Sequence, residues 1–317
     1  MTQHRKLSEL QFQRGAIVVS AGGHLEQAIR RANQFNLDDK VTFYTPENSQ
    51  TASKLIGKKH VTMTNVKSRD LIGLFKAIFE LNKSLSKNDY DYVLSTGAGV
   101  ALACLVVCKF KRIDFVYIES IARQNNPSFT GRILELFNHP ELFTESANFN
   151  DRKWKRIDSL FSSFQKHENS KVLSNDLPLK IFVTVGTVHK YAFQRIVKLV
   201  NSVRHEGDYI VWQIGDVSHK ESSGEVHREM SESALKNFLI SSDVVISHAG
   251  VGSILNILDF GKFPILIPRL SRFGEHIDDH QLQIAALVSK LDLGLVINEG
   301  IERSNLVNAA KLQVKRK

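Results

Sequence analysis

The sequence has little of what stabilises secreted or membrane-spanning proteins. Its only cysteines, Cys104 and Cys108, lie four residues apart in an apolar run. This spacing predicts one face of a buried helix rather than a disulfide or a metal site, and it favours a reducing compartment. The longest apolar run, Gly99–Cys108, is much shorter than the roughly 20 residues that span a bilayer. Met1–Arg14 is polar and has no apolar core, so a secretory leader is not expected.

The positive charge also lacks a pattern typical of nucleic-acid binding. Lysine and arginine number 42 against 33 acidic residues, giving a net charge of +9. The basic residues form no long stripe and no aromatic-interleaved basic motif, so nucleic acid is not an expected partner. Short basic clusters occur at residues 109–112, at residues 152–156 around Trp154, and at residues 315–317. An anionic membrane surface is one interpretation of these clusters, and ordinary solvated surface is the other.

Strands and helices alternate in both halves of the chain, which predicts an α/β fold. The expected strands are nearly continuous in apolar residues, as in parallel sheets covered on both faces. We expect two Rossmann-like βα domains facing across a cleft, at residues 1–137 and 178–317, with residues 138–177 as a polar connector. The expected strands are 16–20, 41–44, 61–64, 92–95, 115–118, 180–185, 209–213, 244–247, 264–268 and 295–297. The expected helices are 49–56, 70–86, 100–110, 191–203, 232–240, 251–260 and 277–291, with two more starting at residues 24 and 301.

Four glycine-containing turns follow expected strands. They lie at residues 20–24, 95–99, 186–187 and 247–253, two in each half. A glycine turn between a strand and a helix presents bare backbone N–H groups and the positive end of the helix, which together suit phosphate. One such turn alone is equally consistent with a tight connection, but four together favour a shared ligand site.

Other chemistries have weaker support. The turn at Gly97 and Gly99, with Glu119 twenty residues later, has the spacing of a dinucleotide fingerprint but lacks its third glycine. Residues 89–91 form an Asp-Tyr-Asp motif, which precedes its strand and therefore predicts a surface turn away from the site. No Gly-x-Ser-x-Gly elbow supports a hydrolase. A zinc site stays open as an alternative, because its candidate ligands cluster in the sequence at Glu275, His276, Asp279 and His280.

Together these motifs resemble glycosyltransferase family 28. The donor half of that family is matched by residues 246–253, 261–269 and 274–281, and by the opening of the second half at residues 182–187 with Phe193. Residues 20–24, 117–123 and 130–131 resemble the partner subunit of two-chain enzymes that act on dolichol-linked or exopolysaccharide precursors. Both halves are joined here in one chain, in a MurG-like arrangement.

The resemblance implies an inverting, metal-independent hexosyltransferase that uses a UDP-sugar and no cofactor. Its implied acceptor is a polyprenyl-diphosphate-linked saccharide for exopolysaccharide or capsule synthesis, which places the protein in the cytoplasm against the anionic inner face of the cell membrane. The implied donor-binding residues are Gly186, Thr187, His248, Gly250, Gly252, Ser253, Asn256, Arg269, Glu275, His276, Asp279, His280 and Gln281. The implied acceptor-binding residues are Gly22, Gly23, Gly97, Gly99 and Arg123.

The acceptor hydroxyl needs a base with a pKa near neutrality, and His24 is our first candidate, ahead of Glu119. The competing interpretations are that His24 only makes hydrogen bonds at a helix start and that Glu119 only pairs with Arg123. One departure from the family is Asn256, where a glutamate is expected to hold the nucleotide ribose. This departure leaves a non-catalytic UDP-sugar-binding protein open as an alternative. A nucleotide-sugar epimerase with the same two-domain fold is a second alternative.

Overall fold

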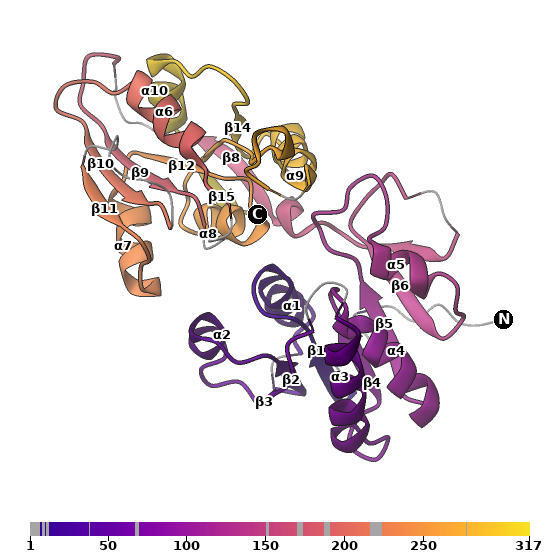
Figure 1. The fold of residues 1–317 in the computed structure, drawn as a ribbon. Helices are drawn as coiled ribbons and strands as arrows, with labels where there is room; N and C mark the ends of the chain where they lie inside the picture. Colours follow the sequence, from indigo (N-terminus) through magenta and orange to yellow (C-terminus); the bar gives the residue numbers. More distant parts are fainter. Residues whose placement is uncertain are drawn as a thin grey trace. The chain divides into compact units, whose positions relative to one another are not determined.

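The computed structural model describes residues 7, 10, 13–37, 39–66, 70–149, 152–169, 174–186, 191–215, 224–276 and 278–317. The chain divides into two compact units, Met1–Leu160 and Phe161–Lys317. Figure 1 shows a parallel sheet with flanking helices in each of them. We describe each unit by itself.

The first unit is built on a seven-stranded sheet in the order β3-β2-β1-β4-β5-β6-β7, in which every neighbouring pair is parallel. Both faces are buried, as successive residues in and just after one of its interior strands show. Ala16 and Val18 lie in one apolar cluster, whereas Ile17 and Val19 lie in another. The strands are β1 Gly15–Val18, β2 Val41–Thr45, β3 His60–Thr62, β4 Tyr92–Ser95, β5 Asp114–Ile118, β6 Pro140–Thr144 and β7 Trp154–Arg156. The helices are α1 Gly23–Gln34, α2 Ser49–Lys54, α3 Leu71–Ser84, α4 Val100–Lys111 and α5 Phe129–Leu134.

The second unit has a six-stranded parallel sheet in the order β11-β10-β9-β12-β13-β14. A separate antiparallel pair joins the start of the unit to the end of the chain, where β8 Phe164–Glu168 pairs with β15 Leu312–Arg316. The remaining strands are β9 Lys180–Thr184, β10 Tyr209–Gln213, β11 Glu225–His227, β12 Val244–Ser247, β13 Ile265–Leu266 and β14 Leu295–Val296. The α-helices are α6 Gln194–Ser202, α7 Glu232–Ser241, α8 Val251–Asp259, α9 His280–Lys290 and α10 Arg303–Ala310. The 3₁₀ turns η2 Leu160–Ser163 and η3 Ser271–Phe273 also occur.

The two Rossmann-like sheets confirm the predicted fold class, but the expected connector at residues 138–177 is wrong. Residues 140–144 and 154–156 form β6 and β7 of the first sheet, and the boundary between the units falls after Leu160. These strands were missed because polar residues interrupt them, as in the Pro-Glu-Leu-Phe-Thr sequence of β6. The prediction that Trp154 could face a membrane is also wrong, because Trp154 is buried in the core and its indole N–H donates to Glu135.

Candidate functional site

The carboxyl edge of the first sheet brings two of the predicted turns together. β1 and β4 are neighbouring strands, and the chain continues from them into α1 and α4. Two hydrogen bonds join the turns: the ring Nδ1 of His24 lies 2.8 Å from the carbonyl oxygen of Thr96, and the Thr96 hydroxyl donates to the carbonyl oxygen of His24 over 2.7 Å. The predicted proximity of residues 20–24 and 95–99 is thus confirmed.

The contact with Thr96 fixes which nitrogen of His24 can take up a proton. A carbonyl oxygen only accepts hydrogen bonds, so Nδ1 carries the hydrogen and Nε2 keeps its lone pair. Burial lowers the pKa of His24 below its usual 6.5, outweighing the hydrogen bond to Thr96. The half-buried imidazole is therefore neutral at pH 7 and has a basic Nε2, which is the state that a general base requires.

The glycines of the first unit divide into two kinds. Gly22 caps α1 with φ 85°, and a Cβ built on Gly22 or Gly23 would meet nothing within 4 Å. These two residues therefore leave open space beside the backbone, as phosphate binding requires. At Gly97, which has φ 126°, a Cβ would lie 2.7 Å from Cε1 of His24, so Gly97 makes room for the imidazole. Gly99 caps α4 and has helical backbone angles.

Glu119 does not fit the role of a second base. Its buried carboxylate accepts hydrogen bonds from the backbone N–H of Ser120 and of Ser128, each over 2.8 Å. The hydroxyl of Tyr117 donates to the same carboxylate over 3.1 Å. Glu119 therefore ties the end of β5 to the start of α5, and these bonds also leave it unsuited to hold a ribose in the dinucleotide interpretation. Arg123 is half-buried in the following turn, and its charge contributes to the low pKa of His24.

The second unit repeats this arrangement with His248. β9 and β12 are paired up to Thr184 and Ser247, so the residues that follow each strand emerge side by side. The ring of His248 lies between two glycines: a Cβ on Gly186 would be 2.5 Å from its Cε1, and a Cβ on Gly250 would be 2.3 Å from its Nε2. Burial and the charge of Arg269 lower the pKa of His248 to about 3, so the ring is neutral. Among the described residues, its buried Nδ1 has no hydrogen-bond partner.

The N-terminus of α8 is the phosphate-binding candidate of this unit. Gly250 caps the helix, and Gly252 and Ser253 form its half-buried first turn. Their backbone N–H groups and the helix dipole favour an anion. Asn256 is half-buried one turn further along and lies on the same helix face as Gly252. Thr187 lies outside the described residues.

Arg269 organises the backbone around this edge rather than offering a free cation. Its guanidinium is fully buried and donates to the carbonyl oxygens of Tyr191, Val185 and Glu275 over 2.9, 3.0 and 3.1 Å. Burial lowers its pKa to about 10, so it stays charged at neutral pH. Arg269, an implied donor-binding residue, therefore has its guanidinium bound to backbone carbonyl oxygens below the surface.

Glu275, another implied donor-binding residue, binds an arginine of the protein instead. Its nearly buried carboxylate binds Arg195 through two bonds, Nε to Oε1 at 3.0 Å and Nη2 to Oε2 at 2.8 Å. Arg195 also donates to the carbonyl oxygens of Pro268 and Asn298. Sequence patterns do not single out Arg195, because its partner lies 80 residues away.

Two further predicted donor-binding residues, Asp279 and Gln281, bind the loop at residues 269–275. Asp279 accepts from the backbone N–H and the hydroxyl of Ser271, each over 2.8 Å, and these bonds lower its pKa. The side-chain oxygen of Gln281 accepts from the backbone N–H of Arg269 over 3.0 Å. Asp279 and Gln281 therefore support the loop through these hydrogen bonds.

His276 and His280 both lie close to Asp278. Nδ1 of His276 lies 3.2 Å from Oδ1 of Asp278, and Nδ1 of His280 contacts the same oxygen. Potential ligand atoms of these three residues lie within 4.8 Å of one another, the one such histidine, cysteine or carboxylate group among the described residues. The predicted zinc set is corrected by this geometry: Asp278 takes the place of Glu275 and Asp279, which bind Arg195 and Ser271.

The Asp-Tyr-Asp motif lies at the opposite edge of the first sheet, as predicted. Asp91 immediately precedes β4, and its carboxylate accepts hydrogen bonds from the backbone and side chain of Arg14.

Comparison with known proteins agrees with the resemblance of the second unit to glycosyltransferase family 28. Residues 180–299 match the glycosyltransferase family 28 C-terminal domain. No curated protein sequence matches the chain significantly. Among solved structures, the chain is similar to MurG of Acinetobacter baumannii, with a TM-score of 0.59 and 16% identity over 93% of this chain and 89% of that one.

Two other solved structures are similar over comparable lengths. Arabidopsis thaliana UGT89C1, complexed with UDP-L-rhamnose, has a TM-score of 0.58 and 14% identity over 94% of this chain and 90% of that one. A putative UDP-N-acetylglucosamine 2-epimerase of Listeria monocytogenes has a TM-score of 0.57 and 11% identity over 94% and 87%. At these identities the likeness establishes the fold. The predicted resemblance is thereby confirmed for residues 180–299, which match the family 28 C-terminal domain, and the chain has the two Rossmann-like units of the GT-B fold.

Proposed function

We propose that the protein transfers a hexose from a UDP-sugar, with inversion, to a polyprenyl-diphosphate-linked saccharide in polysaccharide biosynthesis. One observation carries the proposal. Each unit places a neutral histidine, packed over glycine, at the carboxyl edge of its parallel sheet. In the family 28 unit this edge includes the N-terminus of α8, which suits a diphosphate.

The donor is held by the second unit in this proposal. Backbone N–H groups of Gly250, Gly252 and Ser253 bind the diphosphate, and the buried charge of Arg269 adds to the positive potential. The unpartnered ring nitrogen of His248 supplies one more polar contact. Asn256 accepts or donates a hydrogen bond to a ribose hydroxyl, and His276 and His280 contact the sugar.

The acceptor is held by the first unit. Gly22 and Gly23 offer open backbone at the N-terminus of α1, and Arg123 supplies a charge close to His24, as an acceptor diphosphate requires. Gly97 and Gly99 shape the second turn of this site.

In the reaction, Nε2 of His24 removes the proton from the acceptor hydroxyl while the hydroxyl oxygen attacks C1 of the donor sugar. The bond between C1 and the phosphate oxygen breaks from the opposite side, so the configuration at C1 inverts. The bonding electrons leave with UDP, and the N-terminus of α8 stabilises the developing negative charge. None of these roles needs a metal ion. We place this chemistry in the cytoplasm, at the inner face of the membrane.

The test is UDP release from a panel of UDP-sugars, measured with and without a membrane lipid extract and with and without EDTA. Release that depends on lipid and persists in EDTA supports the proposal. Release abolished by EDTA and restored by zinc would instead assign a metal to His276, Asp278 and His280.

The similarity to a putative epimerase favours a second candidate function. An epimerase would convert a UDP-sugar without any acceptor. Mass-neutral conversion of the sugar without UDP release, followed by NMR, would support the epimerase and contradict the transferase.

A further inference from the structure

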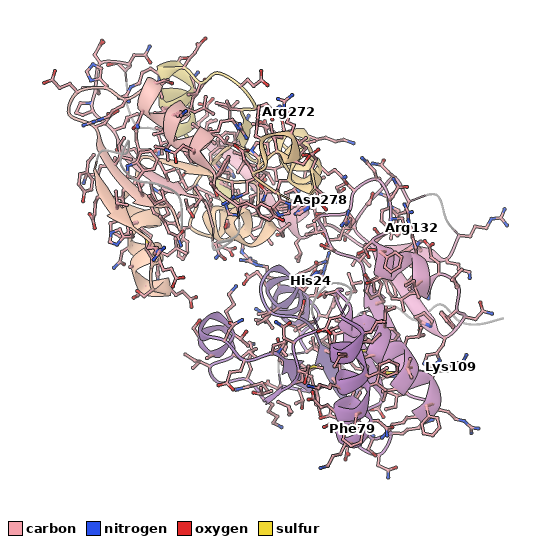
Figure 2. The ribbon with its side chains drawn as sticks, in the orientation of Figure 1. His24, Phe79, Lys109, Arg132, Arg272 and Asp278 are labelled. Atoms are coloured by element: carbon pink, nitrogen blue, oxygen red, sulfur yellow. The ribbon has the colours of Figure 1, made fainter. Side chains whose placement is uncertain are left out.

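Helix α1 carries a stripe of polar side chains on a side that is buried in the first unit. At 3.6 residues per turn, His24, Gln27 and Arg31 fall within an arc of about 60°, so they line one face of the helix. Figure 2 labels His24 on this helix. Gln27 and Arg31 are each only 1% exposed. Polar side chains buried to this extent need specific partners, and those partners determine where the helix lies.

Gln27 binds the turn that follows β5. Its side-chain nitrogen donates to the carbonyl oxygen of Glu119 over 3.0 Å, and its side-chain oxygen accepts from the backbone N–H of Ile121 over 3.3 Å. The same nitrogen lies 3.3 Å from Oε1 of Glu145, which directly follows β6. Gln27 therefore joins α1 to the ends of two neighbouring strands.

Arg31 and Glu145 form a fully buried ion pair. Nη2 of Arg31 lies 2.6 Å from Oε1 of Glu145, and the two side chains are 1% and 0% exposed. Each partner also binds the backbone near the end of the first unit. Arg31 donates to the carbonyl oxygen of Asp158 over 2.7 Å, and Glu145 accepts from the N–H of Leu160 over 3.0 Å. The pair therefore ties α1 to the end of β6 and to the last residues of the unit.

The partners of α1 follow the order of the strands in the sheet. β4, β5 and β6 are successive neighbours. His24 binds Thr96, which follows β4. Gln27 binds the turn after β5 and, together with Arg31, the carboxylate after β6. α1 is thus fastened at three points along the carboxyl edge of the sheet, and these points fix both the position and the rotation of the helix.

Stability alone does not account for the ion pair. Transferring two charges from water to the interior is unfavourable, and apolar residues of similar size in place of a buried pair often give an equally stable protein. An ion pair differs from apolar packing because it is directional: the guanidinium and the carboxylate must meet at one place. Buried polar contacts of this kind can set the register of one element on another. The Arg31–Glu145 pair is suited to that task.

His24 is the residue for which the placement of α1 matters. Its ring lies against Gly97, where a Cβ would be 2.7 Å from Cε1 of the imidazole. A shift of α1 along its axis, or a rotation about it, would move the ring in this narrow space and redirect Nε2. Misplacement of a reacting group by about 1 Å can lower a rate on the order of 100-fold.

We propose that Gln27, Arg31 and Glu145 are positioning residues for His24. They act through α1 and not through contact with a substrate: they hold the helix so that Nε2 of His24 points at the acceptor hydroxyl. This inference rests on the proposed function, in which His24 is the base. The placement of the ring does not depend on that function, so it can be measured separately.

The first measurement is the split between kcat and KM in the full-length protein. Gln27→Met and Arg31→Met should lower kcat by about 10- to 100-fold and leave KM for the UDP-sugar unchanged, because the donor binds the other unit in our proposal. Arg303→Met is the control, since it breaks an ion pair of the second unit with Asp208, whose carboxylate is also 0% exposed. It should lower stability, as Arg31→Met does, but keep the wild-type kcat.

A double variant separates position from stability. Arg31→Met/Glu145→Leu replaces the whole pair by apolar residues, so no unpaired charge stays buried and the urea midpoint should lie above that of Arg31→Met. Its kcat should remain as low as that of Arg31→Met, because the directional contact is still missing. Recovery of kcat together with stability would overturn the proposal, since the pair would then serve stability only.

The second measurement is an NMR titration of His24, with His24→Ala to assign its signal. Burial lowers the pKa of His24, whereas the hydrogen bond to Thr96 and the charge of Glu119 raise it and the charge of Arg123 lowers it. Loosening of α1 in Gln27→Met admits water to the ring, so the pKa should rise toward 6.5.

Arg303→Met should leave the pKa of His24 as in the wild type. An unchanged pKa in Gln27→Met, or a wild-type kcat in Gln27→Met or Arg31→Met, contradicts the proposal. Failure of the proposed function is a separate outcome: the wild type would transfer no sugar, while the change in the pKa of His24 would still show that these residues place the ring.

Discussion

Two reciprocal hydrogen bonds join His24 and Thr96, although the two residues are 72 positions apart in the sequence. The ring Nδ1–H of His24 donates to the Thr96 carbonyl oxygen over 2.8 Å, and the Thr96 hydroxyl returns a hydrogen bond to the His24 carbonyl oxygen over 2.7 Å. The first bond sets the tautomer and the second fixes the start of α1. A histidine held in this way presents one defined basic nitrogen.

We predict that His24→Ala lowers kcat by about 10²–10⁴-fold, the usual contribution of a general base, and leaves the affinity for UDP unchanged. Because the pKa of His24 lies below 6.5, the wild-type rate should be flat from pH 7 upward and fall only on acidification. Steady-state rates between pH 5 and 9 and UDP titration calorimetry measure both effects.

His60→Ala serves as the control, since His60 is exposed on β3 and its ring Nδ1 lies 3.1 Å from the carbonyl oxygen of Lys58. A wild-type rate in the His24→Ala variant, or an equal loss in His60→Ala, would refute the assignment of the base.

The second prediction concerns the glycine that faces His248. Gly186→Ala places a methyl group 2.5 Å from the imidazole, so the ring must move and UDP binding should weaken at least tenfold. Gly300→Ala is a matched control, because Gly300 has nearly the same backbone angle (φ 70° against 74°) and open space around it. Both variants bear the cost of a left-handed alanine, about 1–2 kcal/mol.

Calorimetry with UDP separates the two effects. If both variants lose equal affinity, backbone strain explains the loss and His248 has no part in the donor site. If only Gly186→Ala loses affinity, the ring position matters.

The carboxyl edges of the two sheets could be predicted from the sequence, because short sequence patterns mark them. Each strand that leads into the site is short, apolar and followed by glycine, as at Ser95–Gly97 and Ser247–Gly250. Parallel strands must then align their carboxyl ends, so the turns meet. Sequence patterns do not predict β6 and β15, because these segments become strands by pairing with β5 and β8 and not through their own composition.

The roles of individual side chains were harder to predict. Glu119, Glu275 and Asp279 stand in motifs that suggest ligand contacts, yet each carboxylate is bound by backbone N–H groups or by an arginine. Residue type and spacing cannot distinguish a carboxylate that faces a ligand from one that supports the loop. For Glu275 the position of Arg195, which is 80 residues away in the sequence, decides between the two.

The third prediction tests the support for the donor loop. Arg195→Met leaves the nearly buried carboxylate of Glu275 without its ion-pair partner and frees the carbonyl oxygen of Pro268. Breaking a buried ion pair costs about 3–5 kcal/mol, so the free energy of unfolding of the second unit should fall by that order. UDP affinity should fall with it, since Glu275 also binds the backbone N–H of Leu270.

Arg272→Met is the control, because its pair with Glu299 is exposed and contributes within about 1 kcal/mol. Urea unfolding of both variants measures the difference. Equal stabilities would show that the Arg195–Glu275 pair does not hold the loop.

The last prediction is a pH dependence of stability that His248 causes. Its pKa is about 3 in the folded protein, against about 6.5 for a solvated imidazole, because the ring is buried next to Arg269. Between these values the unfolded chain binds one more proton than the folded one, so stability rises with pH and is complete above pH 6.5. At pH 5 the loss that His248 causes should be about 2 kcal/mol. His248→Asn, which has no titrating ring, should lose that much less than wild type between pH 7 and 5, whereas His205→Asn, at an exposed position, should follow wild type. Urea unfolding at the two pH values decides it, and parallel losses in all three proteins would show that His248 is not kept neutral by the fold.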